Sequence, residues 1–530
     1  MIAGEPSGDH GDGDLVVNLD APVAPNALRV GCATAVFCVG SCFHRTRDIG
    51  RLEVSVGGAR HRATACRMPR PDRFRQLHPG MSPRQEMKTS RDPGSEVDPE
   101  LRSYRSGFWA TVPIAAQPAA GTVELELIAS LRGGGEARAR IAAIEVSDPP
   151  PLPQGSGPVP DASAATIAIC MATFEPDMDL FRAQVASLRN QTATDWICLL
   201  SDDCSDPQSF EELSAEVSGD PRFFVSRSPE RIGFYRNFER ALDMVPPEVE
   251  LVALCDQDDR WYPEKLETLR DALGDAGLAY SDMRLVDASG GVLAESFWAQ
   301  RKNNYTNLAS MLVVNSITGA AMLLRRRVLE LALPFPDMPG WHFHDHWLAL
   351  VALAAGEVAY VDRPLYDYVQ HERAVLGKMT GKSEAEAEAG GEGAPAGRRA
   401  RPWSGLLSRW RAAYFCAYLR LEVQAQVLLA RGSDRLSRPK RRALRRFVAA
   451  GSSPLAFGWL ALRPARLLIG KNETLGSEPV LAKGILWRHL IPLRAAGRSR
   501  PGRSSAEASM PICGLESFGH RRLRRWRTRA

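Results

Sequence analysis

LVALCDQDDRWYPEKLE (residues 251–267) is an apolar, strand-like run that passes directly into three aspartates and then into the start of a helix. Carboxylates this close together repel one another, and a bound divalent cation removes that repulsion. Hard oxygen ligands suit Mg²⁺ or Mn²⁺, and such an ion can also bridge to substrate phosphates. The D-x-D pattern at Asp256 and Asp258 is weak evidence alone, because it also occurs in turns and helix caps.

Two earlier apolar runs end in the same way. TIAICMAT (166–173) leads to Glu175, and DWICLLSDD (195–203) ends on two aspartates, with the helical stretch DLFRAQVASLRNQ (179–191) between them. Strands that alternate with helices predict an α/β fold with a mainly parallel sheet. Ligands of such sheets bind at the carboxyl ends of the strands, which is where these polar residues lie.

The rest of the chain divides by composition. Alternating runs with Gly-rich turns predict a β-sandwich, and a Pro/Gly/Ser stretch predicts a stiff linker before the α/β region. The predicted units are 1–26, a disordered acidic leader; 27–147, an accessory β-sandwich containing a long polar loop at about 70–105; 148–164, a linker; 165–380, the catalytic domain; 381–402, a disordered linker; 403–500, a basic helical region; and 501–530, without assigned structure.

The charge distribution is more informative than the net charge of +5. Residues 401–530 carry 27 Lys and Arg against 6 Asp and Glu, so this part is strongly basic and the remainder is acidic. A basic tail favours contact with an anionic lipid surface, although a solvated Arg-rich tail has the same composition. The apolar stretch 454–469 is shorter than the roughly 20 residues of a spanning helix, so we expect it to lie on a membrane at most.

The ten cysteines form no C-x-x-C pair, and several lie in apolar runs, which favours a reducing cytosol. Cys38, Cys42 and His44 could suggest a metal cluster, but no fourth ligand has matching spacing, so core cysteines are the favoured interpretation. The acidic, Gly-rich N-terminus is unlike a secretory signal. We therefore expect a cytoplasmic protein, with peripheral contact at the inner face of the cell membrane.

Nine motifs occur in an order that resembles bacterial family-2 glycosyltransferases with the GT-A fold, over roughly residues 166–378. They are ICMATFEPD, SLRNQT, LLSDDCSD, RIGFYRNFERAL, LCDQDDRWYPEKLE, YSDMRLVD, NSITGAAMLLRR, HDHWLALVALAAG and RPLYDYVQHERAVLG. Within the family they look most like rhamnosyltransferase-type members. The resemblance implies an inverting hexosyl or deoxyhexosyl transferase with a nucleotide-sugar donor and a divalent metal, Mn or Mg.

Carried over by position, the resemblance implies a donor site. It assigns six residues to the donor: Thr173, Glu175, Asp203, Arg231, Asn237 and Asp256. Alternatives remain open from the residues themselves, since Asp202 and Ser205 can cap the following helix and an exposed arginine is commonly a solvated charge. Many relatives have Asn where this chain has Glu175 and Ala374, so the details of the donor contacts differ.

The resemblance also implies the metal and acceptor sides. It makes Asp258 the metal ligand with support from Asp259, and gives His371 a place at the metal or the diphosphate. Asp345, in WHFHDHWLAL, matches the general base that takes the proton of an acceptor hydroxyl, although it can equally be a helix N-cap. Thr318 and Gly319 match the acceptor-side loop.

The predicted acceptor is a glycan or lipid-linked glycan of a surface polysaccharide, and no nucleic-acid partner is expected. Two other functions fit parts of the sequence. A nucleotidyltransferase would normally have a Gly-rich phosphate loop after the first strand, and ATFEPD contains no glycine. A catalytically inactive scaffold that binds carbohydrate and membrane conflicts with the intact Asp258 and Asp345.

Overall fold

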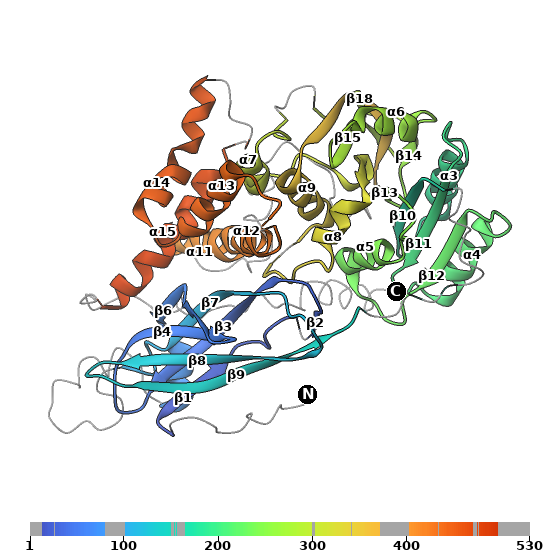
Figure 1. Cartoon of the computed structure of the whole chain (residues 1–530). Coiled ribbons are helices and arrows are strands. Elements are labelled where there is room, and N and C mark those ends of the chain that lie inside the picture. The colour runs from blue at the N-terminus through green and yellow to red at the C-terminus, as the bar shows by residue number, and fades with distance from the viewer. Residues whose placement is uncertain are drawn as a thin grey trace, which may run out of the picture.

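Two β-sheets face one another in the N-terminal part of the chain, and a mixed sheet with helices on both faces follows (Figure 1). The structure is a computed structural model that describes residues 13–25, 27–79, 101–149, 153, 155, 165–298, 303–340, 342–371, 402–432, 434–469, 474 and 476–496. The predicted linker at 381–402 and the segment 501–530 lie outside the described residues, apart from Pro402.

The N-terminal sheets form a sandwich. One has the order β1-β3-β7-β6 and comprises Leu15–Leu19, Thr34–His44, Gly107–Ile114 and Ala65–Met68. The other has the order β2-β9-β8-β4-β5 and comprises Ala27–Arg29, Glu136–Ser147, Gly121–Leu131, Ile49–Val56 and Ala59–Arg62. Alternate residues point inward, as expected for a strand with one buried face. Val36, Val54, Val112 and Leu127 are fully buried between the sheets.

Two details differ from the sequence prediction. β1 lies inside the stretch expected to be a disordered leader and pairs antiparallel with β3, from Leu15 opposite His44 to Leu19 opposite Gly40. A short helix, α1 (Pro71–Leu77), lies inside the stretch expected to be a loop. Its Phe74 is fully buried, and Arg70 just before it makes two hydrogen bonds of 2.9 Å to Asp20. β1 (LVVNL) is apolar but short and follows the acidic, Gly-rich start of the chain, whereas α1 (PDRFRQL) contains few apolar residues.

The central sheet has the order β12-β11-β10-β13-β17-β15-β18-β14, with β16 beside β15. Its strands are Ile167–Thr173 (β10), Trp196–Asp202 (β11), Phe223–Arg227 (β12), Leu251–Cys255 (β13), Arg260–Trp261 (β14), Leu278–Asp287 (β15), Val292–Ala294 (β16), Met322–Arg325 (β17) and Val358–Gln370 (β18). β10 to β13 run parallel, whereas β17 is antiparallel to both of its neighbours. This arrangement confirms the predicted α/β class with a mixed sheet flanked by helices.

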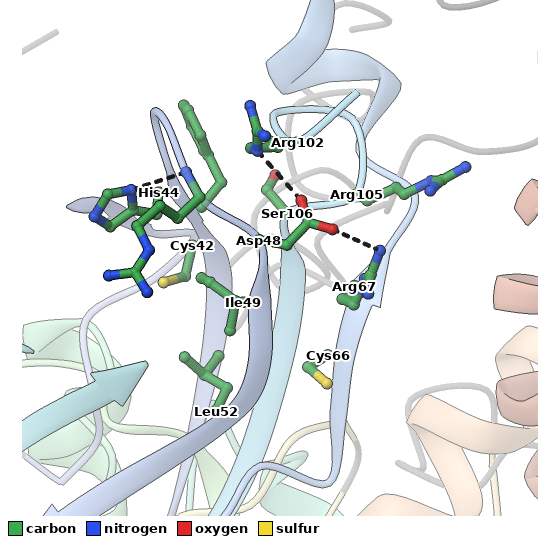
Figure 2. A pocket seen from close by; sticks show the side chains of 12 residues that line it. Cys42, His44, Asp48, Ile49, Leu52, Cys66, Arg67, Arg102, Arg105 and Ser106 are labelled. Carbon is green, nitrogen blue, oxygen red and sulfur yellow. Dashed lines mark hydrogen bonds and ion pairs between the residues drawn. The ribbon is translucent and has the colours of Figure 1, made fainter. Parts of the chain in front are cut away.

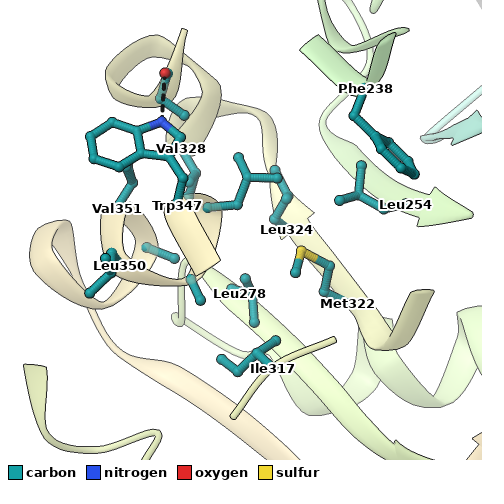
Figure 3. Close-up of a cluster of buried hydrophobic side chains, with 14 of the residues drawn as sticks. Phe238, Leu254, Leu278, Ile317, Met322, Leu324, Val328, Trp347, Leu350 and Val351 are labelled. Atoms are coloured by element: carbon teal, nitrogen blue, oxygen red, sulfur yellow. Dashed lines mark hydrogen bonds between the residues drawn. The ribbon is translucent and has the colours of Figure 1, made fainter. Parts of the chain in front are cut away.

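Helices cover both faces of this sheet. They are Met178–Arg189 (α3), Pro207–Val217 (α4), Gly233–Asp243 (α5), Lys265–Leu273 (α6), Leu308–Val313 (α7), Leu329–Ala332 (α8) and His344–Ala355 (α9), with 3-10 turns at Gly319–Ala321 (η2) and Arg326–Val328 (η3). Most residues of α9 are buried. Its Trp347, Leu350 and Val351 pack against Leu278 and Leu324 of the sheet (Figure 3). The helix is therefore fixed on the sheet from its second turn onward.

The C-terminal helices fill the space beside the central sheet and above the sandwich (Figure 1). They are Pro402–Ala412 (α11), a π-helical turn at Ala413–Tyr418 (η4), Leu419–Arg431 (α12), Arg438–Ala449 (α13), Pro454–Leu462 (α14), a 3-10 turn at Arg463–Ile469 (η5) and Glu478–Ala496 (α15). The predicted helical region is thus confirmed as helical. No helix in the described part of the chain combines the length and apolarity needed to cross a bilayer.

One hydrophobic core joins all three parts. Trp109 of β7 is fully buried and donates a 2.9 Å hydrogen bond from its indole N–H to the hydroxyl of Tyr414. Its ring stacks on Trp487 of α15, with the ring centroids 6.4 Å apart. Arg29 of β2 adds a bidentate ion pair with Asp243 of α5. The sandwich is therefore packed against the rest of the protein over a buried surface as well as connected through the chain.

Candidate functional site

Polar residues of three neighbouring strands meet at one edge of the central sheet. Thr173, the last residue of β10, is directly opposite Asp202, the last residue of β11. On the other side of β10, Met171 is opposite Cys255, so that Asp256 follows at the same level of the sheet. This register places the three strand ends at one edge of the sheet, as expected from the sequence.

Asp202 and Asn237 hold this edge together. Asp202 is fully buried, and its carboxylate accepts hydrogen bonds from the backbone N–H and hydroxyl of Ser205 and from the hydroxyl of Thr173. The amide of Asn237 on α5 donates to the carbonyls of Thr173 and Ser201, at 3.2 and 2.8 Å. Every polar atom of the Asn237 side chain is used within the protein, since its oxygen accepts from the hydroxyl of Ser201. Its contacts are those of a brace between β10, β11 and α5.

Asp203 faces the N-terminus of α5. Its carboxylate accepts hydrogen bonds from the backbone N–H groups of Ile232 and Gly233, at distances between 2.7 and 3.2 Å. Burial raises the pKa of Asp203, and these two N–H groups act in the opposite direction. The guanidinium of Arg231 lies 4.0 Å from this carboxylate and 3.8 Å above the ring of Phe174. A half-buried aromatic ring and an exposed guanidinium thus lie beside a buried carboxylate.

Glu175 is engaged with a helix start. Its carboxylate accepts a 2.7 Å hydrogen bond from the backbone N–H of Asp206 and a 3.0 Å bond from the hydroxyl of Ser209. Its own backbone has a φ of 42°, a left-handed conformation that non-glycine residues rarely adopt. The turn after β10 is therefore fixed by contacts between Glu175 and the first turn of α4.

Gln257 connects the aspartate loop to the turn after β10. Its side-chain oxygen accepts a 2.9 Å hydrogen bond from the backbone N–H of Phe174, and its NH₂ donates to the Phe174 carbonyl at 3.3 Å. The side-chain amide thus makes the same two hydrogen bonds to a backbone N–H and C=O that a residue of a neighbouring strand would make. The D-x-D loop is therefore held in a fixed position relative to the surface formed by Phe174 and Arg231.

Asp258 and His371 meet across the same edge. β14 and β18 pair antiparallel, with Arg260 opposite Asp367, so the end of β18 returns over the aspartate loop. There Nε2 of His371 lies 2.7 Å from Oδ2 of Asp258. Two ligands of one octahedral Mg²⁺ lie about 3 Å apart when each is about 2.1 Å from the ion. The separation of these two atoms is close to that value.

Of the other two aspartates in the loop, Asp256 is partly exposed, like Asp258. Asp259 is fully buried, with one carboxylate oxygen accepting from the backbone N–H of Val369 and the other without a hydrogen-bond partner among the described residues. Burial, followed by the charge of Asp258, raises the pKa of Asp256 to about 7 and raises that of Asp259 well above its usual range. A cation would relieve this repulsion, so the residues present fit one. The described residues contain no cluster of three or more metal-ligating side chains.

Lys265 lies beneath the aspartates. It is fully buried, its ammonium lies 3.5 Å from the centroid of the Trp261 ring, and it donates a hydrogen bond to the carbonyl of Ala320. Burial lowers the pKa of this lysine to about 7. Because Ala320 belongs to η2, Lys265 joins the start of α6 to the loop that carries Thr318 and Gly319.

Asp345 stands in the first turn of α9. Its Oδ1 accepts a 2.6 Å hydrogen bond from the backbone N–H of His346, which leaves the carboxylate at the surface of the helix start. Gly319 packs directly against this point, because a Cβ at Gly319 would lie 2.7 Å from Nε2 of His344 and 3.7 Å from Cβ of Asp345. The predicted acceptor-side loop and the predicted base are therefore in contact.

Tyr368 on β18 links the two halves of the site. Burial raises the pKa of its phenol well above the usual range, and four carboxylates act in the same direction: Asp259, Asp256, Asp258 and Asp345. One side chain is thus influenced by the aspartate loop and by the start of α9 together. The structure brings the predicted metal ligand and the predicted base to the same side of the sheet.

Sequence reasoning missed three residues here: Gln257, Lys265 and Tyr368. Gln257 is the middle residue of the D-x-D pattern, where attention goes to the carboxylates. Lys265 follows the aspartates in the quoted stretch, but a lysine at a helix start is ordinarily solvated. Tyr368 could have been found from the alternation of β18, which places it two residues after the buried Tyr366.

A small cavity in the sandwich is lined by Cys42 and His44, two of the three residues that the sequence suggested as a possible metal cluster (Figure 2). Cys38 and Cys42 lie in the sandwich core. Nδ1 of His44 accepts hydrogen bonds from the backbone N–H groups of Thr46 and Arg47, at 3.3 and 3.2 Å. His44 thus holds the turn after β3, and these contacts agree with the core interpretation.

Comparison with known proteins gives one family match. Residues 169–331 match the family model described as Glycosyl transferase family 2. No curated protein matches the chain. Among solved structures, S. aureus TarS 1-349 in complex with UDP-GlcNAc is similar, at 14% identity and a TM-score of 0.37 over 63% of this chain and 93% of that one. S. aureus TarS 1-349 in complex with UDP has 14% identity and a TM-score of 0.33, over 64% and 94% of the two chains.

Proposed function

Because residues 169–331 match the model of glycosyl transferase family 2, we propose that the protein transfers a sugar from a nucleotide-sugar donor to a hydroxyl group of a glycan or lipid-linked glycan. The observation that carries the proposal is the edge of the sheet where His371 contacts Asp258, and where the charges of Asp258 and Asp345 both act on Tyr368. A metal ligand pair and a candidate base on one side of a sheet are what the transfer of a glycosyl group between phosphate and hydroxyl oxygens requires.

The donor's nucleotide fits the side of the site near β10 and β11. Phe174 and Arg231 provide a surface on which a base can stack, and Asp203 offers acceptor oxygens beside it. The diphosphate then extends towards Asp256 and Asp258 at the end of β13. Thr173, Glu175 and Asn237 support this pocket through their contacts with Asp202, α4 and the strand ends, so we assign them a positioning role.

A divalent cation, Mn²⁺ or Mg²⁺, fits Asp258 and His371, and when bound it would offset the negative charge that develops on the leaving nucleoside diphosphate. Asp258 supplies a carboxylate oxygen and His371 a neutral imidazole nitrogen. Asp259 supports the loop from beneath through its bond to the backbone of Val369.

Asp345 acts as the general base. An acceptor hydroxyl is a weak nucleophile at neutral pH, and a positioned carboxylate takes its proton as it attacks the anomeric carbon. The attack breaks the bond between that carbon and the donor phosphate, and a single displacement inverts the anomeric configuration. Thr318 and Gly319, packed against the start of α9, then border the acceptor.

The decisive experiment screens the full chain against a panel of nucleotide-sugars for donor hydrolysis, with Mn²⁺, with Mg²⁺ and with EDTA. We expect hydrolysis of one donor class that requires the metal. The Asp345→Asn variant serves as a control that should bind the donor but turn it over roughly 10² or more times more slowly. If no nucleotide-sugar is bound or hydrolysed, the transferase proposal fails in favour of a carbohydrate-binding scaffold.

A further inference from the structure

α13 and α14 enclose a surface groove of about 680 Å³ on the side of the molecule away from β10–β12 (Figure 1). Five of its ten lining residues are arginines, and none of these ten residues is acidic. Guanidinium groups gathered on one surface repel one another and attract anions. The composition of the groove therefore indicates an anionic partner.

The arginines of α13 divide the helix into two faces. Leu444 and Phe447 are buried against the rest of the protein, whereas Arg438, Arg442 and Arg445 recur every three to four residues on the exposed side. Within the described part of the chain, these three arginines make no ion pair. The neighbouring Lys440 and Arg435, by contrast, pair with Glu357 and Glu330 of the catalytic part. The basic residues that attach α13 to the catalytic part are therefore different from the arginines that face outward.

α14 provides an apolar border to the same groove. Leu455 is 88% exposed and Leu462 is 72% exposed, which are high values for leucine. The two leucines are separated by two helical turns and therefore lie on the same face of α14. Trp459 lies between them on that face and lines the groove. Ala456 and Leu460 point inward and are buried. The outward leucines therefore contribute nothing to the core of the protein.

We propose that the groove formed by α13 and α14 is a docking site for the surface of an anionic phospholipid bilayer. Headgroup phosphates pair with the outward arginines, while Leu455 and Leu462 enter the boundary between headgroups and acyl chains. A purely anionic polymer would use the arginines but would leave two exposed leucines in water. The combination of unpaired cationic and exposed apolar side chains on adjacent helices favours the bilayer. This inference does not depend on the proposed transferase activity.

The test is sedimentation of the full chain with phosphatidylcholine vesicles, with and without phosphatidylglycerol. The wild type is expected to bind only the anionic vesicles, and binding should weaken as salt rises, because salt screens such contacts. The double variant Arg442→Gln/Arg445→Gln should bind roughly 25-fold more weakly, at about fivefold for each arginine removed. The matched control is Arg51→Gln/Arg140→Gln, two 55% exposed arginines of the sandwich, which should bind like the wild type.

A second pair of variants separates a bilayer from other anions. Leu455→Asn/Leu462→Asn should weaken vesicle binding at least roughly tenfold, whereas Leu293→Asn, a 59% exposed leucine on β16, should not change it. Circular dichroism and thermal melting show that each variant is folded. The proposal is overturned by absent binding, by equal binding to neutral vesicles, or by unchanged binding in either double variant. Tighter binding to single-stranded RNA than to anionic vesicles, unaffected by the leucine variants, would assign the groove to a soluble polyanion.

Discussion

The side-chain amide of Gln257 exchanges two hydrogen bonds with the backbone of Phe174, one in each direction. These residues are 83 positions apart, and the contact joins the loop that carries Asp258 to the turn below Arg231. In the proposed mechanism this contact sets the distance between the surface on which the nucleotide base stacks and the site of the diphosphate.

Replacement of Gln257 by leucine should therefore raise KM for the donor more than it lowers kcat. Loss of the two hydrogen bonds should reduce the free energy of unfolding by only about 1–2 kcal/mol, which thermal melting measures. Gln208→Leu is the control, because Gln208 is exposed on α4 and its side-chain NH₂ donates to the neighbouring Glu212 on the same helix. An unchanged KM would mean that the aspartate loop holds its position without Gln257.

Asp258→Asn should abolish transfer and remove the metal dependence of donor binding. Thermal stability should be nearly unchanged, because Asp258 is near Asp256 and Asp259 and loses charge repulsion along with its bond to His371. Calorimetry of donor binding with and without Mn²⁺ measures this effect. Asp275→Asn, at an exposed position after α6, provides the control. Full activity in Asp258→Asn would disprove the metal assignment.

Asp345→Asn should leave donor affinity intact and lower turnover by roughly 10² or more, the scale of a lost general base. Asparagine can still accept the bond from the N–H of His346, so the start of α9 should keep its position. Steady-state kinetics at several donor concentrations separates the two parameters. A loss confined to donor affinity would instead place Asp345 in the donor pocket.

His344 should make the protein less stable in acid. Burial lowers the pKa of His344 from 6.5 to about 3, and neither ring nitrogen has a hydrogen-bond partner among the described residues. Between pH 6.5 and 3 the unfolded chain binds the extra proton, so the free energy of unfolding falls as the pH is lowered through this range. This contribution is fully present above pH 6.5.

Denaturation of wild type and His344→Phe at several pH values measures the contribution of this histidine. The difference between the two proteins should change by about 1.4 kcal/mol per pH unit within that range. Phenylalanine keeps the stacking on Phe238, whose ring centroid is 3.7 Å away. Parallel pH profiles for the two proteins would show that folding does not lower the pKa of His344.

A chain that begins at Ala162 should be insoluble or melt far below the full chain, since removal of the sandwich uncovers Tyr414 and Trp487. Trp109→Ala in the full chain should cost about 3–5 kcal/mol. Trp109→Phe, which keeps an aromatic ring but loses the N–H, should cost less than half of that. A soluble, active truncated chain would show that the sandwich is an accessory module joined only by its linker.

The sequence predicted the sheet and the edge of the site because strand periodicity and the polar residues at strand ends are local properties. Thr173, Asp203 and Asp256 each follow an apolar run, and parallel strands bring such ends together. The partner of Asp258 was reached only through the family resemblance, since nothing local relates it to His371, 113 positions later.

Other features could not be predicted from local patterns. Glu175 and Asn237 are polar residues at the expected edge, but their side chains bond to a helix start and to backbone carbonyls. Sequence shows that a side chain can form hydrogen bonds and does not show which groups satisfy them. In the same way, helical periodicity after residue 402 predicted the helices but not their packing partner. That partner includes Trp109 of the sandwich, which stacks on Trp487.

The stack of Trp109 on Trp487 has a consequence for synthesis of the chain. A ribosome that has made the sandwich and the central sheet has still not made the residue that completes their shared core. Contacts between such distant positions form late, because the intervening loop must close first. Until α15 emerges, Trp109 lies on an uncovered apolar surface. Nascent chains should therefore depend on chaperones through most of translation, and a ribosome stalled before residue 487 should hold an aggregation-prone product.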